Sequence, residues 1–294
     1  MQGLIIENVS NLYKIKAEAD GKTYDATARG KFKQEGVTPL VGDIVDFDIL
    51  EDRNEIEAVI NEIKPRITEL KRPKVANITQ IIFMISTKHP KPDLLMLDKQ
   101  LAYAEYLKIK PLIIINKTDL SDIFKEIVEI YKKAGYMCFA TNAKEKVGID
   151  KIKEILKGKI SALSGNSGVG KSTTINAIFG KDITLEGEIS QKNKKGKNTT
   201  TSVKLYEVDN DSYIIDTPGF ANFELSEIES KDLENYFIDL KPYVKECEFV
   251  GCTHIKEQNC GIKNAVSQGK ISQQRYENFC KIYLELKEKE ERKW

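Results

Sequence analysis

The stretch "GNSGVGKS", residues 165–172, has the residue types and spacing of a phosphate-binding loop. Its glycines let backbone N–H groups turn inward at the start of a helix, where the helix dipole favours negative charge. Lys171 is expected to contact the β- and γ-phosphates, and the Ser172 hydroxyl to ligate Mg²⁺. The bare pattern arises by chance in roughly one chain in 100, and here an apolar strand precedes it. The sequence therefore predicts a nucleoside triphosphate site.

A second apolar strand, "YIID", ends in Asp216, and Gly219 follows three residues later. An acidic residue at a strand end beside a phosphate loop can hold Mg²⁺ through water, and the glycine amide can contact the γ-phosphate. Asp-x-x-Gly alone is a weak signal because it also forms simple turns. A polar segment upstream contains the threonines 199–201, and we predict that the Thr200 hydroxyl completes the Mg²⁺ shell. A threonine-rich strand start is the alternative.

The tetrapeptide "NKTD", 116–119, follows the buried strand pattern "PLIII". Asp119 can accept two hydrogen bonds from guanine, Asn116 can reach the other base edge, and the Lys117 stem can lie over the ring. Adenine lacks that pair of donors and would leave the carboxylate unpaired in a desolvated pocket, which is how strong discrimination arises. The alternative is a helix cap, because Asp119 or Ser121 would serve before "DIFKEIVEIY".

After the next apolar strand comes Asn142-Ala143-Lys144, in which the Ala143 amide is expected to support the base. The base motif thus precedes the phosphate loop, with Asn116 lying 49 residues before Gly165. All the parts of a guanine-nucleotide site are present, in an order that indicates a circularly permuted α/β domain. The predicted nucleotide-binding residues are Asn116, Lys117, Thr118, Asp119, Asn142, Ala143, Lys144, Ser164, Gly165, Asn166, Ser167, Gly168, Val169, Gly170, Lys171, Ser172 and Thr173.

Three of the five cysteines and one of the two histidines gather in the run Cys247-x4-Cys252-x-His254-x5-Cys260. Thiolate and imidazole ligands in this number are typical of a closed, tetrahedral, structural Zn²⁺ site. Buried thiols or a redox pair are the alternatives. Cys138 and Cys280 are expected in the core, and His89 has no predicted role.

Three segments must position these residues. Residues 1–66 read as short alternating strands without a helix, which predicts a small β-barrel such as the OB-fold, or another small barrel. Residues 67–222 alternate apolar strands with helical spacing, such as 94–108 and 121–134, and predict an α/β sheet of parallel strands joined by crossovers. Residues 223–294 predict a helical, zinc-binding domain, with charged helical stretches at 227–241 and 270–292 around the cysteines.

The whole chain carries little net charge, with 46 Lys and Arg against 45 Asp and Glu, so no global field marks a nucleic-acid binder. No stretch has the roughly 18 apolar residues that span a bilayer, and no secretory signal precedes the first strand. A cytoplasmic protein is the expectation. Any RNA contact would depend on local basic patches such as "KNKKGK", and such charge runs are equally often plain solvated surface.

The permuted motifs, the preceding barrel and the cysteine cluster together closely resemble the ribosome small-subunit-dependent GTPase A family, also called the RsgA or YjeQ family. The likeness extends over nearly the whole chain, through "PLVGDIVDF", "NKTD", "GNSGVGKST", "DTPGF" and "CEFVGCTHIKEQNC". It implies a GTPase that binds the small ribosomal subunit and its rRNA late in assembly and hydrolyses GTP faster when bound. It also implies one structural Zn²⁺, Mg²⁺ with GTP, and, in our prediction, a monomer.

One position departs from the family pattern, and another departs from the pattern of GTPases in general. Asn198 stands where the family usually has a histidine considered for activating water, and Asn142 stands where many GTPases have serine. An asparagine cannot act as a base, although it can orient a water by hydrogen bonding. Phe220 follows Asp-x-x-Gly, where other GTPases use a glutamine, so slow intrinsic hydrolysis is expected. The predicted catalytic residues are Lys171, Thr200, Gly219 and Asn198.

Two other function classes stay open at this point. The first is a GTP-switched RNA-binding module with incidental hydrolysis, which the departure at Asn198 supports. The second is a P-loop kinase acting on a small molecule, against which the guanine motif stands. Turnover measured in the presence of ribosomal subunits would separate these classes from a subunit-stimulated GTPase.

Overall fold

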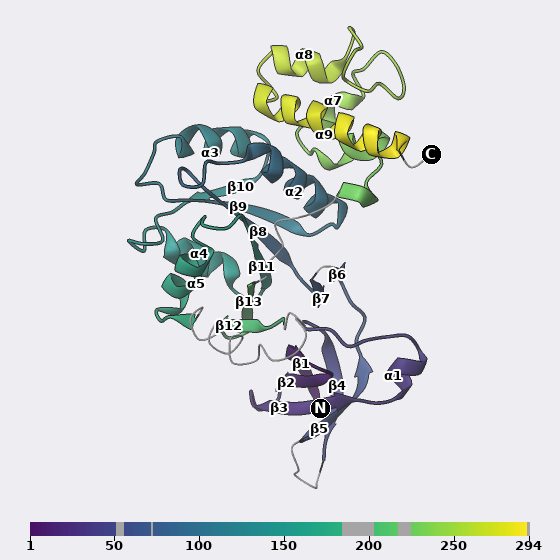
Figure 1. Ribbon diagram of the computed structural model, residues 1–294, viewed down its shortest axis with the longest axis vertical. Coiled ribbons are helices and arrows are strands. Elements are labelled where there is room, and N and C mark those ends of the chain that lie inside the picture. The colour runs from purple at the N-terminus through teal and green to yellow at the C-terminus, as the bar shows by residue number, and fades with distance from the viewer. Residues whose placement is uncertain (51–55, 72, 184–202, 217–224, 293–294) are drawn as a thin grey trace. The chain divides into compact units, whose positions relative to one another are not determined.

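The computed structural model describes residues 1–50, 56–71, 73–183, 203–216 and 225–292. Figure 1 shows its helices and strands along the chain. The described residues group into two compact units. The first unit draws on residues 1–80, 150–163 and 175–220, and the second on 81–149, 164–174 and 221–294. The domain borders that the sequence predicts at residues 66 and 222 stay predictions.

The N-terminal strands form a closed barrel in the order β1-β2-β3-β5-β4, which confirms the predicted OB-like barrel. β1 pairs with both β2 and β4, and β3 pairs with β5 in parallel, so the circle closes. A short helix, α1 (Lys31–Gln34), lies between β3 and β4. The strands are β1 (Gln2–Val9), β2 (Leu12–Ala17), β3 (Thr23–Ala28), β4 (Ile44–Ile49) and β5 (Ala58–Ile63).

The period of two in the barrel strands separates an apolar interior from a polar surface. In β2, Tyr13 and Ile15 are buried, whereas Lys14 and Lys16 are only partly covered. Asp43 is fully buried just before β4 and accepts hydrogen bonds from Arg66, which lies beyond the last barrel strand. This ion pair ties the end of the barrel to the residues that follow it.

The α/β region contains a six-stranded sheet in the order β10-β9-β8-β11-β13-β12. The two central strands, β8 and β11, are almost wholly buried, as their apolar runs predict. The strands are β8 (Gln80–Ser86), β9 (Lys110–Asn116), β10 (Met137–Ala140), β11 (Ile160–Ser164), β12 (Leu205–Asp209) and β13 (Ser212–Asp216). A separate two-stranded ribbon, β6 (Glu69–Lys71) with β7 (Lys74–Ala76), follows the barrel.

The sheet is mixed rather than wholly parallel. β10 pairs with β9 in parallel and β11 with β13 in parallel, but β12 runs antiparallel to β13. Only Asn210 and Asp211 separate β12 from β13, and Asp211 has a φ of 56°. A connection of two residues forms a hairpin and is far too short for a parallel crossover.

Among the described residues, the helices that accompany these strands are α2 (Leu94–Tyr106), α3 (Phe124–Lys133), α4 (Ile149–Leu156) and α5 (Lys171–Phe179). The first two confirm the predicted helical stretches 94–108 and 121–134 to within a few residues. Asp93 caps α2, since its side chain accepts a hydrogen bond of 2.9 Å from the Met96 amide. α2 packs on β9, and α3 packs on β10.

The C-terminal residues are helical, but the stretch 227–241 is not the single helix that its charge pattern indicates. It contains 3-10 turns and ends where α7 begins with Pro242 in its first turn. Proline cannot continue a preceding helix because its ring clashes with the carbonyl four residues earlier. The elements are η1 (Leu225–Glu227), η2 (Ser230–Tyr236), α7 (Lys241–Val244), α8 (Gly261–Ser267) and α9 (Gln273–Glu291).

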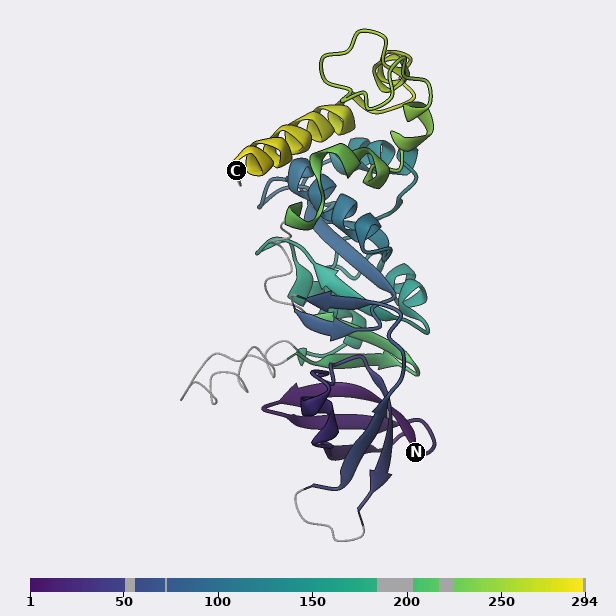
Figure 2. The same cartoon turned by 90° about the vertical axis from the view of Figure 1, so that its right-hand side faces the viewer.

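The C-terminal helices share a hydrophobic core with α2, and α9 runs alongside both α2 and η2 (Figure 2). Arg275 on α9 is 1% exposed and stands at the centre of this contact. It donates to Asp98 of α2 and to Asp239, at 2.5 Å each, and its guanidinium lies 4.6 Å from the centre of the Phe237 ring. Asn278 donates to the other Asp98 oxygen at 2.6 Å. The buried charges are thus paired and hydrogen-bonded.

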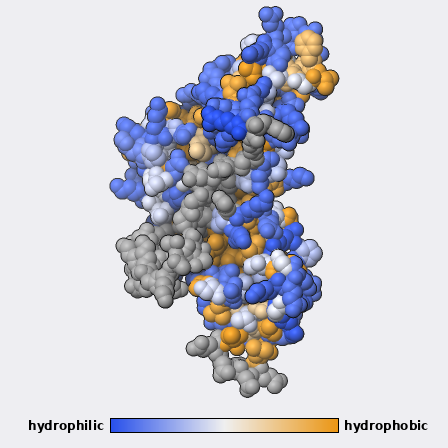
Figure 3. All heavy atoms as spheres, turned by 45° about the vertical axis from the view of Figure 1, so that its right-hand side comes forward, coloured by the Kyte–Doolittle hydropathy of each residue, from blue (hydrophilic) through white to orange (hydrophobic). Residues whose placement is uncertain are grey.

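The surface of the described residues is mixed in character. On the face in Figure 3, hydrophobic side chains are scattered among hydrophilic ones. Among the described residues, no helix combines the length and the hydropathy needed to cross a membrane.

Candidate nucleotide pocket and metal centre

Asn116 is the last residue of β9 and holds three parts of the predicted site together. Its side chain is 2% exposed. Its Oδ1 accepts from the Thr141 hydroxyl at 3.1 Å and from the Ala143 amide at 3.0 Å, while its Nδ2 donates to the Val169 carbonyl at 3.0 Å. The base motif, the Asn-Ala-Lys loop and the phosphate loop are therefore joined by one buried amide.

Lys117 takes a left-handed backbone conformation, with a φ of 62°, directly after this strand. Its ammonium donates to the Gly168 carbonyl at 2.7 Å and also to the His89 carbonyl. The lysine stem is thereby held beside the phosphate loop. Thr118 donates its hydroxyl to the Thr141 carbonyl at 3.1 Å, and the exposed Asp119 carboxylate follows.

These residues line a pocket of about 300 Å³. That volume is at the lower end of the range for small-molecule sites. The pocket brings together residues from the base motif, the Asn-Ala-Lys loop and the phosphate loop, which are far apart in sequence. Its lining consists of Asn116, Lys117, Asp119, Leu120, Asn142, Lys144, Gly170 and Thr173.

At two positions of the phosphate loop a neighbouring atom lies so close to the backbone that only glycine fits. A Cβ on Gly165 would lie 2.3 Å from the Met84 carbonyl oxygen, and one on Gly170 would lie 2.3 Å from Asn116 Nδ2. Gly170 also has a φ of 103°, which other residues rarely adopt. Any side chain at Gly170 would push the phosphate loop away from the base motif.

The phosphate loop ends at α5, whose first residue is Lys171. The Lys171 ammonium donates to the Gly165 carbonyl at 2.6 Å and to the Asn166 carbonyl at 3.0 Å. Thr174 donates its hydroxyl to the Gly170 carbonyl at 2.9 Å, which fixes the first turn of the helix. Backbone amides at such a helix start, with a lysine across the loop, form a site suited to phosphate.

The Asn-Ala-Lys loop is a tight turn in which Asn142 and Val147 exchange two backbone hydrogen bonds. The Asn142 side chain accepts from the Glu145 amide at 3.4 Å, a local bond for which asparagine is well suited. The Ala143 amide donates to Asn116, so its predicted contact with a base would require that bond to be exchanged. Lys144 lies in the pocket wall.

The structure places the remaining predicted residues as follows. Ser164 is buried at the end of β11, and Ser172 and Thr173 are exposed in the first turn of α5. Asp216 is the last residue of β13, and its backbone pairs with Leu163. Asn198, Thr199–Thr201, Gly219 and Phe220 lie outside the described residues.

Sequence reasoning missed two contributors to the pocket region. The His89 carbonyl accepts from Lys117, and Thr141 bonds both Asn116 and Thr118. Thr141 immediately precedes the Asn-Ala-Lys motif, which was a usable signal. The contact of His89 left no signal in the sequence, because a backbone carbonyl can accept a hydrogen bond whatever the side chain.

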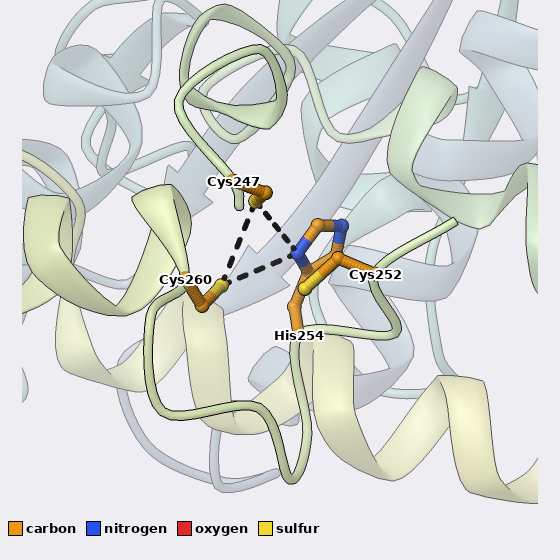
Figure 4. Close-up of side chains that lie close together, drawn as sticks. All are labelled: Cys247, Cys252, His254 and Cys260. Carbon is orange, nitrogen blue, oxygen red and sulfur yellow. Dashed lines mark hydrogen bonds between the residues drawn. The ribbon is translucent and has the colours of Figure 1, made fainter. Parts of the chain in front are cut away.

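The four predicted zinc ligands converge in the C-terminal region (Figure 4). One donor atom from each of Cys247, Cys252, His254 and Cys260 lies within 4.8 Å of the others. His254 Nδ1 is 3.5 Å from the Cys247 sulfur and 3.3 Å from the Cys260 sulfur, and these two sulfurs are 3.9 Å apart. Tetrahedral zinc bonds imply about 3.8 Å between sulfurs and about 3.6 Å between sulfur and nitrogen. The distances among Cys247, His254 and Cys260 are therefore close to those of a tetrahedral ion, and the Cys252 sulfur lies within 4.8 Å of the other three donor atoms.

Local turns of the chain aim these side chains at one point. Cys247 follows α7, and Cys260 directly precedes α8. His254 has a φ of 62°, an uncommon conformation for a residue other than glycine, and its side chain is 1% exposed.

Burial disfavours negative charge on the thiols of this cluster. It raises the pKa of Cys252 to about 12, and it also raises the pKa of Cys260. A divalent cation among the sulfurs would favour the thiolates instead, since metal ligation deprotonates thiols. The donor set of three thiols and one imidazole can hold a metal ion, and four protein ligands would leave no open position on it.

Two family models match the chain. One, described as the RsgA N-terminal domain, matches residues 2–60, and the other, described as the RsgA GTPase, matches residues 63–226, more than half of the chain. The chain belongs to the RsgA GTPase family. It is therefore a GTP hydrolase, and the family resemblance noted in the sequence is confirmed.

Relatives and solved structures of this family match over the full length. Two relatives are named "Small ribosomal subunit biogenesis GTPase RsgA". The one from Clostridium botulinum (strain Kyoto / Type A2) is 37% identical, with all of both chains covered. The one from Alkaliphilus metalliredigens (strain QYMF) is 36% identical, with 97% of this chain and 98% of the relative covered.

The crystal structure of YjeQ from Thermotoga maritima has a TM-score of 0.83 and 36% identity, covering 97% of this chain and 98% of that one. The structure of YloQ, described as a circularly permuted GTPase, has a TM-score of 0.79 and 29% identity, covering 98% and 95%. These matches confirm the predicted fold class, including the permuted order of the nucleotide motifs.

Proposed function

We propose that this GTP hydrolase acts in biogenesis of the small ribosomal subunit, and that the subunit stimulates its hydrolysis of GTP. The observation that carries the proposal is that the base motif, the Asn-Ala-Lys loop and the phosphate loop line one pocket together. The relatives that match over the full length are named for small-subunit biogenesis. The expected site of action is the cytoplasm, as a monomer bound to the subunit and its rRNA.

In this proposal the pocket reads guanine. Asp119, exposed at the pocket wall, accepts from the two donors of the base, and the Lys117 stem, already held beside Gly168, lies over the ring. Asn116 uses one amide N–H for Val169 and offers the second to the base. The nucleotide-binding residues are those predicted from the sequence, from Asn116 to Lys144 and from Ser164 to Thr173.

The phosphates lie in the loop before α5. Lys171 would exchange its bonds to the Gly165 and Asn166 carbonyls for phosphate oxygens. The exposed Ser172 hydroxyl and the residue at the end of β13, Asp216, are the proposed Mg²⁺ ligands, with Thr200 as a third. Magnesium, when bound, neutralises charge on the phosphate oxygens.

The proposed catalytic residues are Lys171, Thr200, Gly219 and Asn198. Lys171 stabilises charge on the γ-phosphate, Thr200 supports the metal, and the Gly219 amide contacts the γ-phosphate. Asn198 orients a water and cannot deprotonate it. Hydrolysis by the protein alone should therefore be slow.

We propose that the metal of the C-terminal cluster is one structural Zn²⁺, held by Cys247, Cys252, His254 and Cys260. Three sulfur donors and one nitrogen donor favour zinc over Mg²⁺ or Ca²⁺, which take oxygen ligands. The ion would hold the loop between α7 and α8. The chain is proposed to divide into a barrel (1–66), the GTPase domain (67–222) and this zinc domain (223–294).

The test is GTP turnover by the purified full-length protein alone, with small ribosomal subunits, and with large subunits. We expect slow turnover alone and at least about ten-fold faster turnover with small subunits only. Equal rates in all three reactions would overturn the stimulation. Tight, GTP-dependent binding to small subunits without faster turnover would favour a GTP-switched binding module, the alternative that Asn198 supports.

A further inference from the structure

Glu234 touches the metal cluster without being one of its four predicted ligands. Its Oε2 lies 2.6 Å from Nε2 of His254, the ring nitrogen that faces away from the cysteines. Glu234 belongs to η2, 20 residues before His254 in the chain. Its side chain is 26% exposed, whereas that of His254 is 1% exposed. A carboxylate therefore reaches a buried imidazole from its outer edge.

A carboxylate at this place decides which nitrogen of the ring carries the proton. A neutral imidazole has one N–H donor and one nitrogen with a lone pair. An ionised carboxylate can only accept a hydrogen bond, so the ring nitrogen that bonds to Glu234 must be the donor. The proton of the neutral ring is therefore on Nε2. The lone pair is then on Nδ1, which lies 3.5 Å from the Cys247 sulfur and 3.3 Å from the Cys260 sulfur.

Other contacts fix the histidine backbone but leave its ring orientation to Glu234. The Tyr276 hydroxyl donates to the His254 carbonyl at 2.7 Å. The Phe279 ring lies 6.0 Å from the imidazole, centre to centre, with the planes tilted by 52°. Neither contact distinguishes the two ring nitrogens. Glu234 distinguishes them, because it makes its hydrogen bond to Nε2.

We propose that Glu234 is a positioning residue of the metal centre, which sets the tautomer and orientation of His254 for ligation through Nδ1. The proposal rests on the proposed zinc site. Outer carboxylates of this kind raise the basicity of a ligating histidine, and their loss typically lowers metal affinity about 10- to 100-fold. Metal binding is thereby linked to η2, whose Leu233 is fully buried in the core shared with α2.

The experiment compares zinc affinity in full-length variants by competition with a chromogenic chelator. Glu234→Ala should weaken zinc about 10- to 100-fold, and Glu234→Gln, which keeps a carbonyl acceptor but no charge, about 3- to 10-fold. Glu229→Gln is the matched control, because it removes one carboxylate of the same segment that pairs with the exposed Lys231. The control should bind zinc like the wild type.

Two further readouts keep the result interpretable. Substitution of Co²⁺ for zinc should give the visible spectrum of a tetrahedral, sulfur-rich site in the wild type, with altered bands in Glu234→Ala. Nitrogen chemical shifts of His254 in zinc-loaded wild type should show the proton on Nε2. If Glu234→Ala does not fold, Glu234→Gln decides the question with the same chelator and cobalt measurements.

The possible failures are distinct. Zinc affinities within two-fold of wild type for both Glu234 variants, in a wild type that binds one zinc tightly, would overturn the role of Glu234 alone. Equal weakening in Glu229→Gln would show a general charge effect and also overturn it. A wild type that holds no zinc would overturn the proposed metal, and this inference with it.

Discussion

The nucleotide pocket and the metal cluster are both organised by one buried polar side chain, but in different ways. Asn116 satisfies its Oδ1 and one Nδ2 hydrogen with protein partners drawn from two loops. His254 has a protein partner at Nε2, while its Nδ1 faces two sulfurs. Hydrogen bonds within the protein hold the pocket together. The cluster instead brings together sulfur and nitrogen atoms that can ligate a cation.

This difference follows from what each site must do. The walls of the pocket are joined by direct hydrogen bonds within the protein. A closed metal site need not open, and the ion can supply the stabilisation that a short loop lacks. We therefore expect the metal region to depend on its ligand for folding and the pocket to be independent of it.

Removal of the metal should have the largest effect on folding. Structural zinc contributes roughly 10 kcal/mol or more to small zinc-dependent folds, so chelation should unfold the loop between Cys247 and Cys260 in the full-length protein. Hydrogen exchange measured by mass spectrometry would show faster exchange in this loop and in α8. Protection of the pocket strands β9 and β11 should change little.

Two variants control this prediction. His254→Ala should reproduce the effect of the chelator without any chelator being present. Cys280→Ser should not, because Cys280 lies on α9 outside the cluster. Unchanged exchange in the loop after complete zinc removal would show that protein contacts alone hold it, and the contrast with the pocket would be lost.

Arg275→Ala should have the next largest effect, because the substitution leaves Asp98 and Asp239 buried without their partner. Burial by itself would lower the pKa of Arg275, but these two carboxylates raise it well above its ordinary value. Removing one partner of a buried charge pair typically lowers the free energy of unfolding by about 3–5 kcal/mol. Thermal and urea unfolding would measure the loss.

The exposed pair Lys99–Glu285 is a matched control on the same two helices, with its charged atoms 2.5 Å apart. Lys99→Gln should change stability by less than about 1 kcal/mol, because a solvated pair contributes little. Equal losses from Arg275→Ala and Lys99→Gln would mean that the buried cluster does not join the C-terminal helices to α2.

Asp119→Asn tests how the pocket selects its base. We expect GTP affinity to fall about 100-fold and xanthosine triphosphate to bind better than GTP, because the asparagine amide matches the carbonyl of xanthine where Asp119 matches the amino group of guanine. Binding of fluorescent nucleotide analogues would measure both affinities. Asp122→Asn, on the same loop but paired with the exposed Lys125, is the control. An unaltered preference for GTP would mean that the base is read by other residues.

The smallest effect concerns Cys138 on β10. Burial raises the pKa of its thiol to about 12, so the unreactive neutral thiol dominates at pH 8, and its thiolate fraction should grow about ten-fold per pH unit up to that value. Alkylation followed by peptide mass spectrometry should leave Cys138 largely unmodified at pH 8. After chelation, Cys247, Cys252 and Cys260 should become modified while Cys138 does not. Rapid modification of Cys138 at pH 8 would contradict the prediction.

Local chemistry explains how much could be predicted from the sequence. Phosphate, guanine and zinc each require particular residue types at short spacing, so the phosphate loop, "NKTD" and the cysteine run were recognisable, as were the apolar strands. The antiparallel β12 and the division of 227–241 into 3-10 turns and α7 were predicted less well. In both places a short local feature, a two-residue connection or Pro242, overrode the longer pattern.

By itself, the sequence determined which chemical groups this protein has and the order in which it presents them. Only the tertiary structure decided which of them meet. Asn116 reaches Val169 across 53 residues, Glu234 reaches His254 across 20, and Arg275 reaches Asp98 across 177. A hydrogen bond between residues so far apart leaves no periodic or local trace in the chain. Its partners are chosen by how the strands and helices pack, which the residue types alone do not specify.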